Sequence, residues 1–192
     1  GSDDGYVQIT RDNGNSWKNI TPKKIGETLV NAIEVSPHDP ATVYIATTKY
    51  KLGDYTPAIY KSSNYGKTWK NISSGIPYGA HTRVVREDKT KKGLLYAGTE
   101  LGIYISFNGG KTWESFQRNL PTTPILDLKV HHNDLVVATS GRSFWILDNL
   151  SLISQYDKRK KAVKLYSPEP IVYGNWGSRM NGNIDNFNGM QN

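Results

Sequence analysis

An eight-residue pattern occurs three times in this chain and constrains its fold more than any other feature. The copies cover residues 10–17, 62–69 and 106–113, and they align without gaps. Each copy reads Ser or Thr, any residue, Asp or Asn, any residue, Gly, any residue, Ser or Thr, and Trp. Because a recurring pattern is the mark of a repeat architecture, we infer that the chain is built from repeated units.

The fixed positions of this pattern hold the residue types that close a tight turn. An Asp or Asn oxygen accepts backbone N–H bonds, and a Gly two residues later supplies a positive φ. These turn residues are Asp12 with Gly14, Asn64 with Gly66, and Asn108 with Gly110. The aromatic residues that end the copies, early in the next strand, are Trp17, Trp69 and Trp113. We interpret the repeat as structural, with each indole covering an apolar face.

Short β-prone segments surround each turn, which always falls between a third and a fourth strand. One unit is expected to have strands at residues 30–35, 43–47, 59–61 and 69–72, and the next at 83–86, 94–98, 103–105 and 113–116. A last unit, without the special turn, has candidates at 125–130, 135–139 and 144–147. Four-stranded units repeating every 40–50 residues or so are typical of a β-propeller.

We therefore predict an all-β fold, a partial β-propeller of four-stranded antiparallel blades. Residues 1–28 are expected to form a partial blade, 29–76 and 77–121 two blades, and 122–170 a final blade. Residues 171–192, rich in Gly and Asn, are expected to form a flexible exit segment. Since closure of a propeller needs at least about four blades, the remaining blades should come from a longer chain or from another copy.

Composition excludes several classes of site. The chain has no Cys, which removes disulfides, thiol nucleophiles and Cys-ligated metals. No metal and no other cofactor is expected, because no His or carboxylate spacing matches a ligand set. No apolar run approaches the roughly 18 residues of a membrane span. The net charge of +7 suits a soluble basic surface or a polyanion site, with Lys158–Lys161 as its one dense run. Nucleic acid is not expected as a partner.

The repeated turns resemble the Asp-box, or bacterial neuraminidase repeat, of sialidases and sortilin-type propellers. Residues 96–106 and 138–148 are similar to the sortilin-like group of secreted bacterial proteins, in which a Gly-Arg-x-Phe-Trp strand marks the last blade. The resemblance covers about residues 4–170. It implies the C-terminal part of one propeller and a secreted, periplasmic or cell-surface location.

Signatures of catalysis are sparse. The Arg-Ile-Pro segment found early in sialidases is absent. Asp-box glycoside hydrolases use two carboxylates that face each other across a cleft. The candidates here are Asp127, within 125–130, and Glu34, in the equivalent strand of an earlier unit. The alternative is that both are structural side chains that are paired or point outward.

Ligand-binding candidates lie on the loops opposite the repeated turns, where propellers usually bind. The longest loop, residues 48–56, carries Tyr50 and Tyr55, which suit stacking on sugars or contacts with peptides. Glu100 and Arg142 occupy matching loops of adjacent units and are candidates either for a ligand site or for an ion pair with each other.

Two further residues, His81 and Arg83, open a unit on the same face. Together these features predict a non-catalytic secreted scaffold that binds a protein, a peptide or a glycan. The alternative is part of an Asp-box glycoside hydrolase whose active site is shared with blades outside this chain.

Overall fold

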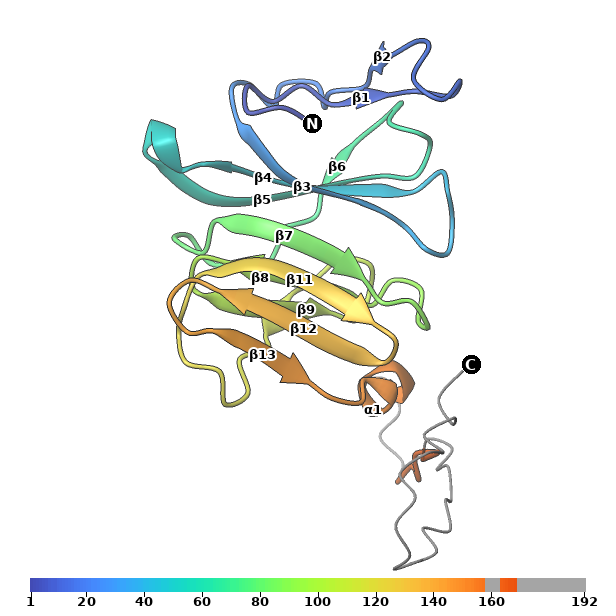
Figure 1. The fold of residues 1–192 in the computed structure, drawn as a ribbon, viewed down its shortest axis with the longest axis vertical. Coiled ribbons are helices and arrows are strands. Elements are labelled where there is room, and N and C mark those ends of the chain that lie inside the picture. The colour runs from blue at the N-terminus through green and yellow to red at the C-terminus, as the bar shows by residue number, and fades with distance from the viewer. Residues whose placement is uncertain (158–162, 169–192) are drawn as a thin grey trace, which may run out of the picture.

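The computed structural model describes residues 1–157 and 163–168, and these residues form an all-β fold (Figure 1). The basic run Lys158–Lys161 and the expected exit segment 171–192 lie outside the described residues. No helix among the described residues is long and apolar enough to cross a membrane.

Four antiparallel sheets follow one another along the chain. The first pairs β1 (Gln8–Ile9) with β2 (Lys18–Asn19). The second contains β3 (Leu29–Val35), β4 (Val43–Lys49), β5 (Asp54–Ser62) and β6 (Lys70–Asn71). The third contains β7 (Thr82–Glu87), β8 (Leu95–Thr99), β9 (Gly102–Ser106) and β10 (Glu114–Ser115). The last contains β11 (Ile125–His131), β12 (Asp134–Thr139) and β13 (Phe144–Leu147).

The structure confirms the all-β prediction, and every expected strand has an observed counterpart. The largest difference is in residues 48–56, which we expected to be a loop. Here β4 and β5 extend into a long hairpin whose tip is a 3₁₀ turn, η1 (Tyr50–Leu52). A short helix, α1 (Ser151–Gln155), follows the last sheet.

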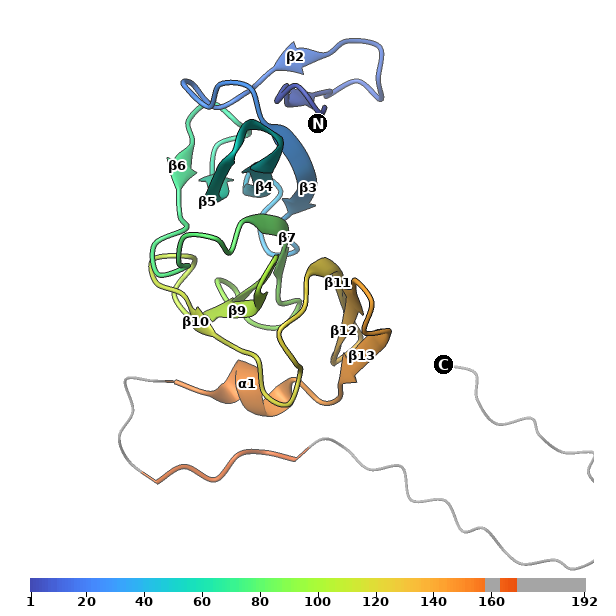
Figure 2. The same ribbon diagram turned by 90° about the vertical axis from the view of Figure 1, so that its left-hand side faces the viewer.

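The sheets are arranged as blades, with equivalent strands in equivalent places. The first strands β3, β7 and β11 lie side by side, and the fourth strands β6 and β10 lie on the opposite edge (Figure 2). Each sheet is a meander in which consecutive strands pair. The first strands therefore form the inner side of the array, and the two-residue fourth strands form its perimeter.

The hydrophobic core lies between the blades. Tyr44 and Ile59 of the second sheet pack with Val85 and Leu95 of the third, and all four are buried. A second cluster joins Tyr96 and Ile105 of the third sheet to Leu128 and Leu135 of the last. Full burial of a Leu or Ile side chain contributes about 1.5–3 kcal/mol, so these contacts between faces hold neighbouring blades together.

The three repeated turns have almost the same hydrogen bonds. In the second copy the Gly66 amide donates to Ser62 Oγ at 2.9 Å, and the Thr68 amide donates to Asn64 Oδ1 at 2.9 Å. The third copy repeats both bonds, from Gly110 to Ser106 Oγ and from Thr112 to Asn108 Oδ1. In the first copy Thr10 and Asp12 accept the same pair from Gly14 and Ser16.

Two of these turns also dock onto the preceding blade. Trp69 Nε1 donates to the carbonyl oxygen of Ile20 at 2.6 Å, and Trp113 Nε1 donates to that of Ile72 at 2.5 Å. A Cβ at Gly66 or Gly110 would overlap the same isoleucines. The first turn has no such neighbour, and Trp17 is 60% exposed. The repeat therefore closes a turn and joins one blade to the blade before it.

Candidate functional site

Three elements bring aromatic and charged side chains together at the end of the blades opposite the repeated turns. The β4–β5 hairpin supplies Tyr50 and Tyr55, and the segment before β7 supplies Tyr78 and His81. The same segment continues into β7, which supplies Arg83, and the third element, the β8–β9 turn, supplies Glu100. We call these six residues the aromatic site.

Backbone hydrogen bonds hold the three elements of the site in register. The Gly79 amide donates to the carbonyl oxygen of Tyr55 at 3.2 Å, which fixes the segment before β7 against the hairpin. The Glu100 amide donates to the carbonyl oxygen of His81 at 3.0 Å. Thr82 Oγ1 lies 3.0 Å from the carbonyl oxygen of Thr47, next to the hairpin. The site is thus positioned by a rigid scaffold.

The rings of the site form a partly exposed surface around His81. Tyr50 stacks on His81, with the ring centroids 5.5 Å apart and the planes 16° from parallel. Tyr55 lies 6.0 Å from His81 and meets Tyr78 edge to face at 6.3 Å. Tyr50 is 37% exposed, Tyr55 42% and Tyr78 68%. Three tyrosines therefore present both apolar ring surface and hydroxyl groups to a ligand.

His81 lies at the buried centre of the site. Neither of its ring nitrogens makes a hydrogen bond of normal geometry, although Nε2 lies 3.4 Å from a carboxylate oxygen of Glu100. Burial lowers the pKa of His81, while the Glu100 carboxylate opposes that shift. The ring is consequently held in its neutral form more strongly than an exposed histidine.

An ion pair lies next to the rings. Arg83 donates to the same carboxylate oxygen of Glu100 from Nε at 2.8 Å and from a terminal nitrogen at 2.5 Å. We expected Arg142 as the alternative partner of Glu100, but the structure pairs Glu100 with Arg83. Arg142 lies in the β12–β13 loop, where its backbone bonds Thr139 and Trp145 and its side chain is exposed. The sequence indicated the loop of Glu100 but not its partner, which lies on strand β7.

Sequence reasoning did not single out Tyr78 or Leu101, which lies beside Glu100 and is 43% exposed. Both residues stand on segments expected to face a ligand. The available signal for Tyr78 was its place directly after Pro77, in the segment that links two blades.

The two candidate carboxylates Glu34 and Asp127 lie on the inner strands β3 and β11, and one arginine binds both. Arg86, on β7 between them, lies 2.8 Å from Asp127 Oδ1 and 3.4 Å from Glu34 Oε2. It also donates to the carbonyl oxygen of Leu128 at 2.7 Å. Burial raises the pKa of Glu34, and the charge of Arg86 counteracts part of that rise. This inner-strand triad joins three blades.

Neither the aromatic site nor the triad has a ligand set for a metal. Among residues 1–157 and 163–168, no group of three or more His, Asp or Glu side chains could hold an ion. The aromatic site presents rings and one ion pair, whereas the charged side chains of the triad already pair with one another.

Comparisons with known proteins show which fold the chain shares with solved structures. No family model matches the chain, and no curated protein is significantly similar to it in sequence. Among solved structures, YCF48 bound to a D1 peptide matches with a TM-score of 0.57, 17% identity, and coverage of 77% of this chain and 46% of the other. YCF48 from Cyanidioschyzon merolae matches with a TM-score of 0.52 and 17% identity, over 76% of this chain and 47% of the other.

A GH74 xyloglucanase from Xanthomonas campestris matches with a TM-score of 0.58 and 16% identity, over 77% of this chain and 26% of the other. The chain thus spans less than half the length of each of these propellers. At such low identity the likeness shows a shared fold, in which the sheets of this chain match blades of larger proteins.

Proposed function

We propose that this chain is a non-catalytic binding module that takes up a peptide segment at the aromatic site. One observation carries the proposal: two partly exposed tyrosines lie against the buried His81, a third lies against one of them, and the Arg83–Glu100 ion pair lies beside the histidine. Tyrosine and arginine are enriched where proteins bind one another, because they offer a large contact area together with hydrogen bonds. The sortilin-like kinship and a location outside the cytoplasm remain part of this proposal.

The geometry favours a peptide over a sugar ring. Tyr55 and Tyr78 stand at 89° to each other, so they form a corner and not a flat platform. A corner of rings accepts a side chain, and the neighbouring ion pair can bond polar groups of a peptide backbone. One similar propeller was solved with a peptide, which supports this class of ligand.

A peptide-display library panned against the full chain tests the proposal. Selected peptides should lose at least tenfold in affinity with Tyr50→Ala, Tyr55→Ala or Tyr78→Ala, since truncation of a central aromatic anchor typically costs about 2 kcal/mol or more. Tyr6→Ala is the matched control, because Tyr6 is 52% exposed and lies outside the site. Selected peptides that bind all four variants alike, or binding of xyloglucan oligosaccharides alone, would contradict the proposal.

A second candidate function is part of a glycoside hydrolase, with Glu34 and Asp127 as the carboxylate pair. The observation that favours it is the difference between the two environments, because Glu34 has a raised pKa and Asp127 is 61% exposed. Arg86 stands against it, since its guanidinium occupies the space between the two carboxylates. Turnover of xyloglucan that Glu34→Gln and Asp127→Asn each abolish would establish this alternative and overturn the non-catalytic assignment.

A further inference from the structure

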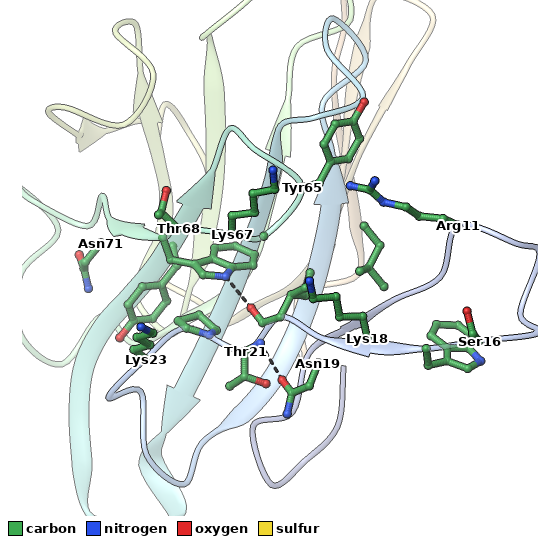
Figure 3. A pocket seen from close by; sticks show the side chains of 17 residues that line it. Arg11, Ser16, Lys18, Asn19, Thr21, Lys23, Tyr65, Lys67, Thr68 and Asn71 are labelled. Carbon is green, nitrogen blue, oxygen red and sulfur yellow. Dashed lines mark hydrogen bonds between the residues drawn. The ribbon is translucent and has the colours of Figure 1, made fainter.

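Two grooves run between the blades on the side of the repeated turns, away from the aromatic site. The wider one, of about 870 Å³, lies between the first two sheets (Figure 3). The narrower one, of about 570 Å³, lies between the second and third sheets. Thr68, Trp69 and Asn71 line both of them, so the two grooves adjoin on one surface. We call this surface the perimeter groove.

The perimeter groove is lined by cations and by no carboxylate. Its basic residues are Arg11, Lys18, Lys23 and Lys67 in the wider part and Lys61, Lys70 and Lys111 in the narrower part. Within the described ranges, none of these seven side chains forms an ion pair. Charges of one sign that gather in a concave surface raise the local concentration of oppositely charged ligands.

The neutral side chains of the groove also present donors. Asn19 Oδ1 accepts from the Thr21 amide at 2.9 Å, and Asn71 Oδ1 accepts from the Ser73 amide at 2.9 Å. These bonds orient both side chains and leave their NH₂ groups available to donate to a ligand. The groove is thus a surface of N–H donors, which matches carboxylate, sulfate and hydroxyl oxygens.

Two aromatic rings of the groove, Tyr65 and Trp69, make contacts within the protein, whereas Trp17 is 60% exposed. The guanidinium of Arg11 lies over the ring of Tyr65, 4.8 Å from its centroid. Trp69 is fixed by its bond to the Ile20 carbonyl oxygen, which Figure 3 shows as a dashed line. Single-stranded nucleic acid usually binds on rings that are free to stack with its bases. Trp17 is the one described ring of the groove that is more than half exposed, so there is no row of free rings for successive bases, and the arrangement favours an anionic polymer without bases.

We propose that the perimeter groove binds an anionic polysaccharide, whose carboxylate or sulfate groups lie against the lysines. The two grooves together accommodate a chain and not a single sugar, because they are contiguous around Trp69. Both grooves lie between sheets that are neighbours in the structure. The proposal stands independently of the aromatic site.

Binding of polygalacturonate and of heparin to the full chain, measured calorimetrically over a range of NaCl concentrations, tests this. Affinity should fall as salt rises, and each lost lysine contact should reduce the slope of log K against log salt by about one. Neutral xyloglucan should not bind at the groove. Affinity for both anionic glycans that does not change with salt would overturn the proposal.

Matched variants locate the site. Two double variants should each weaken binding at least tenfold. One combines Lys18→Gln with Lys67→Gln, and the other combines Lys70→Gln with Lys111→Gln. The control, Lys51→Gln with Lys89→Gln, removes the same charge from exposed positions outside the groove and should change affinity less than twofold. Equal losses in all three variants, or a loss confined to neutralisation of Lys158–Lys161, would overturn the assignment. Tighter binding of single-stranded DNA than of either glycan would overturn it as well.

Discussion

At the scale of single residues, the repeated turn works through hydrogen-bond acceptance and not through charge. Asp12 accepts from the Ser16 amide at 2.8 Å, and Asn64 and Asn108 accept the same bond from Thr68 and Thr112. Bonds from Ser16, with a further one from Thr10, lower the pKa of Asp12. Because two neutral copies make the same turn, its formation does not depend on a carboxylate.

Titration of His81 makes the stability of the folded chain depend on pH. Because burial lowers its pKa below about 6.5, protonation costs more in the folded chain than in the unfolded one. The stability that comes from a neutral His81 is fully present above the pKa of this residue in the unfolded chain. It is lost as pH falls through the pKa of His81 in the folded chain. We expect the melting temperature to drop between pH 7 and pH 5, and the drop to be smaller in His81→Gln.

The control for this experiment is His131→Gln, because His131 is exposed at the end of β11. Its melting temperature should follow that of the parent chain across the same pH range. The quantity compared is the slope of melting temperature against pH and not the absolute stability. A His81 variant that is destabilised equally at every pH therefore remains informative. Identical slopes for all three proteins would show that His81 does not titrate as the structure indicates.

At the scale of elements, the sequence predicted the strands well because their pattern is local. The Asp or Asn, Gly and Trp positions fix each third and fourth strand, and all eleven expected strands are observed. Residues 48–56 were less predictable, since Tyr50 and Tyr55 lie on a hairpin whose length depends on pairing between β4 and β5. The partner of Glu100 was likewise set by the register of β7 against β8, which puts Thr82 opposite Thr99 and so brings Arg83 close.

Replacement of the glycines in the repeated turns has two destabilising effects, backbone strain and steric overlap, which can be measured separately. Gly14, Gly66 and Gly110 all have positive φ, so Ala strains the backbone at each by about 1 kcal/mol. Only at Gly66 and Gly110 would the added Cβ also overlap an isoleucine of the preceding blade. Gly110→Ala should therefore lower the free energy of unfolding by at least 1 kcal/mol more than Gly14→Ala, by urea denaturation. Equal losses would show that the contact with the preceding blade has no energetic weight.

At the scale of the whole molecule, the blades share their cores. One cluster bridges the second and third sheets, and another bridges the third and the last. The inner-strand triad around Arg86 adds a polar link across β3, β7 and β11. The third sheet belongs to both clusters, so we expect the second, third and last blades to unfold together as one cooperative unit.

Leu128→Ala tests this cooperativity. Leu128 is 1% exposed in the last sheet but packs in the cluster that contains Val84 and Tyr96 of the third. Its truncation should cost about 2–5 kcal/mol and should shift a single transition seen alike by circular dichroism and by tryptophan fluorescence. Leu126→Ala is the control on the same strand, since Leu126 is 48% exposed. Two separate transitions in Leu128→Ala would show that the last blade unfolds alone.

The central claim is that the repeated turns join blades and do not carry out a reaction. Tryptophan at the same position of each copy allows a direct comparison, because the Trp69 and Trp113 indoles bond the preceding blade and the Trp17 indole has no such partner. The test is the free energy of unfolding of Trp17→Phe, Trp69→Phe and Trp113→Phe. We expect losses of about 1–3 kcal/mol at Trp69 and Trp113 and less than about 0.5 kcal/mol at Trp17. Equal losses at all three positions, or no loss at Trp113, would contradict the account.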